Sequence, residues 1–159
     1  MARTKVRRAV HDTAHSRRWY ADKLGWEPSL EAPGTLVYDV DGSAFTLFES
    51  DLAGTAKNTV MIWNVADVRD EVARLRKRGV QFEEYDFGDI KTVDGVMSDP
   101  DGGGMNAWFK DPDGNIVSVL SSPGPRPEPV TAMLAASDLA RAKRWYAEKL
   151  GFEPVGESQ

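Results

Sequence analysis

The sequence predicts an α+β fold in which two modules with the order strand–helix–strand–strand–strand form curled sheets covered by helices on one face. Three observations support this prediction. The same order of patterns occurs in residues 1–55 and 56–121, a proline-rich segment follows at 122–129, and a partial third copy occupies 130–159. An apolar fraction of 41% and a charged fraction of 28% are typical of a globular chain.

The first module opens with a strand pattern at Val6–Val10 and a helix from Thr13 to Leu24. Asp12 is placed to cap the start of this helix, and Gly25 follows its end. Further strand patterns occur at Glu27–Glu31, Thr35–Val40 and Ser43–Glu49. Asp41-Gly42 predicts a tight hairpin between the last two strands.

The second module repeats this order, with a strand at Thr59–Val65 and a helix at Val68–Arg78. Its later strands are predicted at Gln81–Asp86, Met105–Lys110 and Asn115–Leu120. Asp-Pro-Asp-Gly at 111–114 is a turn sequence that closes the last hairpin. In both modules the sheet face away from the helices must curl to bury itself, and curling creates a cavity.

An internal repeat marks the third copy. RWYADKLGWEP at Arg18–Pro28 returns as RWYAEKLGFEP at Arg144–Pro154, with nine of eleven positions identical. Leu139, Ala142, Tyr146 and Leu150 then form an apolar stripe at helical spacing. A strand plus helix of about 30 residues is too small to form its own core. We expect either a truncated second domain or, preferably, a unit exchanged with a neighbouring chain across the proline-rich linker.

Charge and composition exclude several classes of function. The net charge of −5 argues against nonspecific binding to nucleic acid or anionic membranes. The absence of cysteine excludes disulfides, thiolate metal sites and a cysteine nucleophile. No apolar run is long enough for a membrane span, and the basic N-terminus lacks the apolar core of a signal peptide. We therefore expect a cytoplasmic protein.

The segments DTAHSRRWYADKLGW and SDLARAKRWYAEKLGF resemble the opening of modules in the vicinal oxygen chelate superfamily. Glyoxalase I, extradiol dioxygenases and bleomycin-resistance proteins belong to it. VADVRDEVARLRKRGV resembles its second helix, and AWFKDPDGNIVSVL its last hairpin. The resemblance covers residues 5–121 and a second opening at 130–157. It implies that residues 1–121 form one domain with an open, barrel-like pocket, usually within a dimer.

The resemblance also implies metal ligands on the first and last strand of each module. Those positions carry Lys5, Glu49, Val60 and Ser118. Only Glu49 is a competent donor, so we expect no metal cofactor unless the alignment is displaced by a residue or two. The alternative for Glu49 is a strand-end carboxylate that is solvated or paired with a cation such as Lys5.

His11 and His15 have the spacing of a zinc-binding His-Glu-x-x-His motif. That motif requires both histidines on one helical face. Asp12 caps the helix in our interpretation, so His11 lies outside it, and no third ligand is evident. We interpret both histidines as surface residues near a helix start.

The remaining candidates line the predicted pocket. From strand parity we expect these side chains on the concave face: Phe45, Leu47, Glu49, Val60, Ile62, Asn64, Ile116, Ser118 and Leu120. Tyr85 and Trp108 are candidate rim aromatics beside the 86–104 loop. A mostly apolar wall with a few polar groups is the composition of a small-molecule site. Core packing is the alternative, especially for Phe45 and Ile62.

The favoured function is a metal-free, bleomycin-resistance-like protein that binds a small molecule, as a homodimer. One alternative is a metal-dependent, glyoxalase-like lyase, isomerase or dioxygenase. Another is a module kept for oligomerisation alone. The identity of the ligand, and whether any catalysis occurs, stay open.

Overall fold

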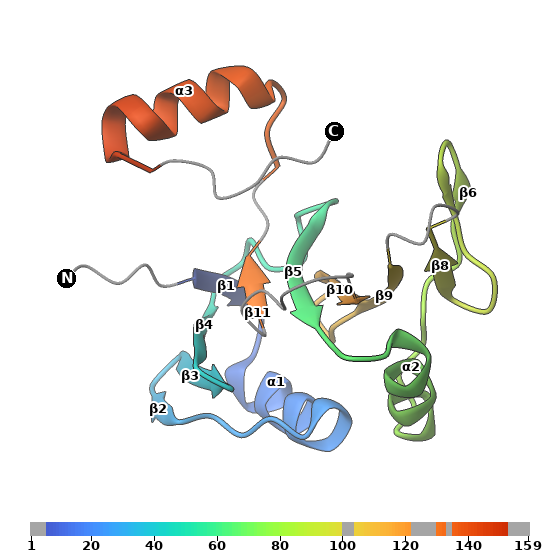
Figure 1. The fold of residues 1–159 in the computed structure, drawn as a ribbon. Coiled ribbons are helices and arrows are strands. Elements are labelled where there is room, and N and C mark those ends of the chain that lie inside the picture. Colours follow the sequence, from blue (N-terminus) through green and yellow to red (C-terminus); the bar gives the residue numbers. More distant parts are fainter. Residues whose placement is uncertain (1–5, 100–103, 122–129, 133–134, 153–159) are drawn as a thin grey trace.

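Two sheets, in which the strands of each module have the same order, form the framework of the fold (Figure 1). The computed structural model describes residues 6–99, 104–121, 130–132 and 135–152. In each sheet the first strand of a module lies beside its last strand, giving the orders β1-β4-β3-β2 and β5-β10-β9-β8. The predicted α+β fold of two βαβββ modules is confirmed, and the sheets do not close into a barrel.

The first module contains β1 (Val6–Val10), α1 (Thr13–Trp19), η1 (Tyr20–Leu24), β2 (Leu30–Ala32), β3 (Thr35–Val40) and β4 (Ser43–Glu49). Asp12 caps α1 by accepting a hydrogen bond of 3.0 Å from the His15 amide, as predicted. The helix widens into η1 and ends at Gly25, whose φ of 79° is left-handed. β1 runs parallel to β4, and β2 to β4 form an antiparallel meander.

The second module contains β5 (Thr59–Asn64), α2 (Val68–Lys77), β6 (Asp86–Phe87), β7 (Ile90–Lys91), β8 (Val96–Ser98), β9 (Met105–Lys110) and β10 (Ile116–Ser121). The strand predicted at Gln81–Asp86 is wrong. β8 pairs with Met105 to Ala107 on the edge of β9, which leaves residues 82–83 only an isolated bridge and one amide bond to β9. The predicted 86–104 loop therefore supplies the missing strand.

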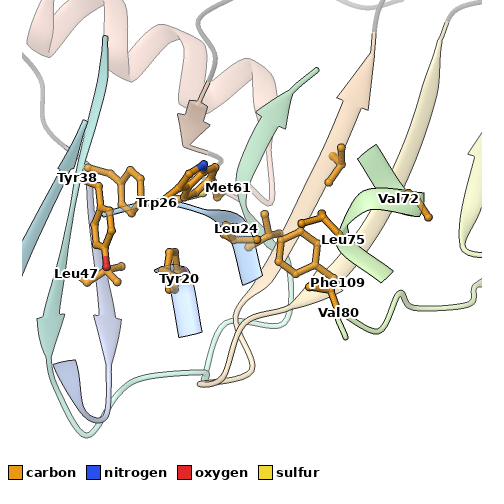
Figure 2. Close-up of a cluster of buried hydrophobic side chains, with 14 of the residues drawn as sticks. Tyr20, Leu24, Trp26, Tyr38, Leu47, Met61, Val72, Leu75, Val80 and Phe109 are labelled. Carbon is orange, nitrogen blue, oxygen red and sulfur yellow. The ribbon is translucent and has the colours of Figure 1, made fainter. Parts of the chain in front are cut away.

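Both modules contribute to one hydrophobic core (Figure 2). Tyr20 and Leu24 of η1 lie between the two sheets, with Leu47 on one side and Phe109 on the other. Trp26, just after η1, has its ring centroid 5.9 Å from that of Phe45 in β4 and 4.8 Å from that of Trp63 in β5. The opening helix of the first module is thus also a packing surface for the second.

The third copy forms β11 (Val130–Ala132) and α3 (Leu139–Leu150). β11 pairs antiparallel with the outer edge of β5 in the same chain, so it does not lie beside a last strand as β1 does. No residue of α3 is buried, and the helix stands apart from both sheets in Figure 1. None of the described helices is long and apolar enough to cross a membrane.

Candidate functional site

One face of the second sheet carries most of the predicted pocket residues. Met61, Val117, Val119 and Phe109 pack in the core with Val72 and Leu75 of α2. Because side chains alternate along a strand, the residues between them lie on the opposite face. The strand register places these there: Val60, Ile62, Asn64, Trp108, Ile116, Ser118 and Leu120. We call this set the second-module face.

A partly buried hydrogen bond lies within the second-module face. The Ser118 hydroxyl donates to Oδ1 of Asn106 at 2.5 Å, and Ser118 is only 2% exposed. Asn106 pairs directly with Leu120 across the hairpin, so it shares that face. Asn106 is not among the residues predicted from the sequence. Counting back from the predicted turn at 111–114 would have found it, because the turn fixes the register of the hairpin.

Aromatic rings lead from this face to the surface. Trp108 is buried, and its ring centroid lies 5.5 Å from that of Tyr85 in an edge-on contact. Tyr85 in turn contacts the exposed Phe87 at 5.4 Å. Burial raises the pKa of the Tyr85 phenol, so it stays a neutral hydrogen-bonding group at neutral pH. The structure therefore brings the two predicted rim aromatics together.

In the first module the side chains of β4 that were expected on the concave face lie on the opposite face of the sheet. Phe45 and Leu47 lie in the core, on the face that packs against the opening helix. The Phe45 ring stacks on Tyr38 at 5.0 Å and contacts Tyr20 at 6.4 Å. The opening helix needs an apolar surface beneath it, and these residues supply it. The structure does not bring them to the second-module face.

Glu49 has the same parity and lies at the strand end beside the start of α1. Its Oε1 accepts hydrogen bonds from the Thr13 hydroxyl at 2.7 Å and from the Thr13 amide at 3.1 Å. The hydroxyl bond, followed by the amide bond, lowers the pKa of the Glu49 carboxyl. Its described partner is thus Thr13, and Lys5, the cation considered above, lies outside the described residues.

Of the metal positions that the resemblance implies, the three that the structure describes do not fit an ion. Glu49 is bound to Thr13, Val60 has no donor atom, and the Ser118 hydroxyl is bound to Asn106. Within the described parts of the chain, no three His, Cys, Asp or Glu side chains gather to hold a metal. His11 precedes α1 and contacts Asp113 through Nδ1 at 2.8 Å, so it does not share a helical face with His15.

A buried polar cluster, which the sequence analysis missed, joins the two modules. The Asp111 carboxylate accepts hydrogen bonds from the Tyr20 hydroxyl at 3.0 Å and from the Asn115 side chain at 3.0 Å. Nη2 of Arg8 lies 3.1 Å away, and both side chains are buried. Desolvation raises the pKa of Asp111 and lowers that of Arg8, in each case against the attraction of the pair.

Comparison with protein-family models matches residues 4–119 to the Glyoxalase/Bleomycin resistance protein/Dioxygenase superfamily. The chain therefore belongs to this superfamily, as the opening motifs, the last hairpin and the paired βαβββ modules indicate. β11 and α3 lie beyond the matched residues. Comparison with curated proteins found no match.

Solved structures share the fold at low sequence identity. A glyoxalase-related enzyme from Fulvimarina pelagi has 19% identity and a TM-score of 0.59, over 85% of this chain and 99% of that one. A glyoxalase/bleomycin resistance protein from Catenulispora acidiphila has 20% identity and a TM-score of 0.57, over 76% and 97%. A fosfomycin resistance protein from Listeria monocytogenes, complexed with Mn(II), has 13% identity and a TM-score of 0.56, over 74% and 87%.

Proposed function

We propose that this cytoplasmic protein binds a small, partly apolar molecule at the second-module face and does so without a catalytic metal. One observation carries the proposal. Val60, Ile62 and Ile116 are half-buried, and they share this face with the Ser118–Asn106 hydrogen bond. An apolar wall with few polar groups is typical of small-molecule sites.

The chemistry of the face indicates how a ligand is held. Covering the aliphatic side chains contributes about 25 cal/mol for each Å² of apolar surface removed from water. Trp108 and Tyr85 offer ring edges and faces to a flat group. The amides of Asn64 and Asn106 orient a polar group, since each carries both donors and an acceptor. Binding of this kind is stoichiometric and requires no reaction.

We also propose that the protein is a homodimer, and that exchange of the repeated strand–helix unit contributes to it. The apolar side chains of α3 support this proposal, because Leu139, Trp145 and Leu150 are exposed in the single chain. Large apolar groups gathered on one helix indicate an interaction surface.

Binding can be tested by thermal shift with a panel of small amphipathic metabolites and antibiotics, followed by calorimetry on any compound that stabilises the fold. Ile62→Ala should weaken the binding of such a compound by about tenfold, equivalent to about 1.4 kcal/mol. Val37→Ala is the matched control, because Val37 is also a half-buried strand residue but lies in the first sheet. Equal effects of the two variants would contradict the proposed site.

The metal-dependent alternative has one supporting observation, the Mn(II) complex of the Listeria relative. Metal analysis of protein purified without chelators distinguishes the two functions. We expect substoichiometric metal. Stoichiometric Zn, Ni, Fe or Mn would favour a glyoxalase-like lyase, isomerase or dioxygenase. A chain that binds neither metal nor any compound of the panel, yet dimerises, would favour the oligomerisation module.

A further inference from the structure

We propose that residues 130–152, the C-terminal unit, are a second occupant of the site that holds the opening helix of the first module, and that they fill this site in a second copy of the chain. The site, which we call the opening slot, is the sheet surface formed by Tyr38, Phe45 and Leu47. The inference rests on the homodimer proposed above and specifies how its exchange takes place.

The side chains that fill the opening slot recur in the C-terminal unit. Tyr20, Leu24 and Trp26 are between 1% and 8% exposed, whereas their counterparts Leu150 and Phe152 are 48% and 52% exposed. Tyr146, the counterpart of Tyr20, is half-buried. The same apolar side chains are therefore buried in the opening helix and largely exposed in the C-terminal unit.

The helix of the C-terminal unit begins and ends with the same geometry as its counterpart. Asp138 caps α3 through the amide three residues later at 2.8 Å, as Asp12 caps α1. Gly151 ends α3 in the left-handed region with φ 67°, as Gly25 ends η1 with φ 79°. The amide of the following aromatic residue then bonds back to Tyr146 or Tyr20 at 3.2 Å in both copies. Docking therefore requires little reshaping at the two ends of the helix, so less conformational entropy is lost there.

The charges around the opening slot also match. Arg17 of α1 pairs with Glu31 at 2.8 Å and with Glu27 at 3.3 Å. The corresponding position of α3 is Lys143, which keeps the positive charge that faces Glu31 in the docked position. The Tyr146 hydroxyl corresponds to that of Tyr20, which donates to Asp111.

The strand and helix that now fill the opening slot bring a buried arginine with them, which reduces the stability of the fold. Arg8 of β1 is only 6% exposed; its Nη2 lies 3.1 Å from the Asp111 carboxylate, whereas Nε and Nη1 make no hydrogen bond to any described residue. The ion pair compensates the charge, but burying two donors without hydrogen bonds costs free energy. The sequence position that corresponds to Arg8 is Leu134. Exchange therefore removes apolar side chains of α3 from water, and it must offset the exposure of the displaced Tyr20, Leu24 and Trp26 and the loss of the Arg8–Asp111 pair. β11 is held to β5 by three residue pairs, fewer than the five that hold β1.

The chain contains no cysteine, so a chemical cross-link can test the exchange without background. Full-length Glu31→Cys and Lys143→Cys variants are mixed, refolded together and treated with a short bismaleimide. We expect a covalent dimer on a denaturing gel. Adding Leu150→Asp to the second variant should abolish it, whereas adding Leu52→Asp, at an exposed loop residue, should not. The doubly substituted Arg17→Cys/Glu31→Cys chain shows that the linker spans the slot.

Two outcomes would overturn the inference. One is the absence of the mixed cross-link, and the other is a cross-link that forms only within a doubly substituted Glu31→Cys/Lys143→Cys chain. Light scattering of the unmodified protein separates this failure from failure of the proposed dimer. A dimeric mass without the mixed cross-link rejects only the exchange, and a monomeric mass rejects the dimer as well. Ligand binding is measured independently of both.

Discussion

The Tyr20 hydroxyl donates a hydrogen bond of 3.0 Å to Oδ2 of Asp111, and both side chains are buried. Tyr20 belongs to the opening helix of the first module, and Asp111 begins the turn of the last hairpin of the second. This contact fastens the helix between the two sheets. It couples the modules by a polar bond in addition to the shared apolar core.

Removing this hydroxyl should destabilise the fold, because Asp111 loses a buried donor. We expect Tyr20→Phe to lower the free energy of unfolding by about 1–3 kcal/mol. Tyr38→Phe is the matched control, since the Tyr38 hydroxyl is buried without a partner among the described residues. Its removal should be neutral or stabilising. Urea denaturation measures both, and a larger loss for Tyr38→Phe would contradict this account.

Arg8 and Asp111 should be energetically coupled. Removing one partner of a buried ion pair leaves the other charge uncompensated and typically costs about 3–5 kcal/mol. We expect Arg8→Leu and Asp111→Asn each to be strongly destabilising, and the double variant to lose less than the sum of the two. A double-mutant cycle in urea measures the coupling. If the losses of the two single variants add up to the loss of the double variant, Arg8 and Asp111 are not energetically coupled.

The stabilising effect of Glu49 should depend on pH. Its pKa is lowered in the folded state by the Thr13 hydrogen bonds. The contribution is therefore fully present above the unfolded pKa of about 4.3 and is lost as the pH falls through the lower folded pKa. Glu49→Gln should reduce the melting temperature at pH 7 more than at pH 3. A difference that is independent of pH would reject this role.

Gly54 should resist substitution more strongly than Gly42. Both have positive φ, which costs about 1–2 kcal/mol for other residues. A Cβ at Gly54 would also lie 2.0 Å from the Asp113 carbonyl oxygen, whereas one at Gly42 meets nothing within 4 Å. We expect Gly54→Ala to lose clearly more stability than Gly42→Ala in thermal denaturation. Similar losses would show that the loop at Gly54 moves freely away from the hairpin.

The sequence was informative where the signal is local. The cap at Asp12, the Asp41-Gly42 turn and the helix at Val68 are all as predicted, because capping, turn chemistry and helical spacing act over a few residues. The residues of β5 and β10 were assigned to one face correctly, since alternation and a defined turn fix the register.

The sequence alone did not reveal which face of the first sheet the opening helix covers. The sequence pattern of Phe45 and Leu47 fits both core packing and pocket lining. In the folded chain both residues lie in the core, where Phe45 contacts Tyr20 and Tyr38. Glu84 likewise has no special signal in the sequence. Glu84 lies in the segment 81–86, where a strand was predicted. In the structure its carboxylate accepts hydrogen bonds from Thr92 and Gly95 of the following loop.

The sequence by itself determined the two modules, the family and the repeat at 144–154, because these are encoded in local patterns and their order. Tertiary structure alone decided the partners of Arg8, Glu49 and Asp111. Each of these polar side chains is matched by groups far away in the chain, and the energy of such pairs depends on burial and geometry that no sequence pattern records.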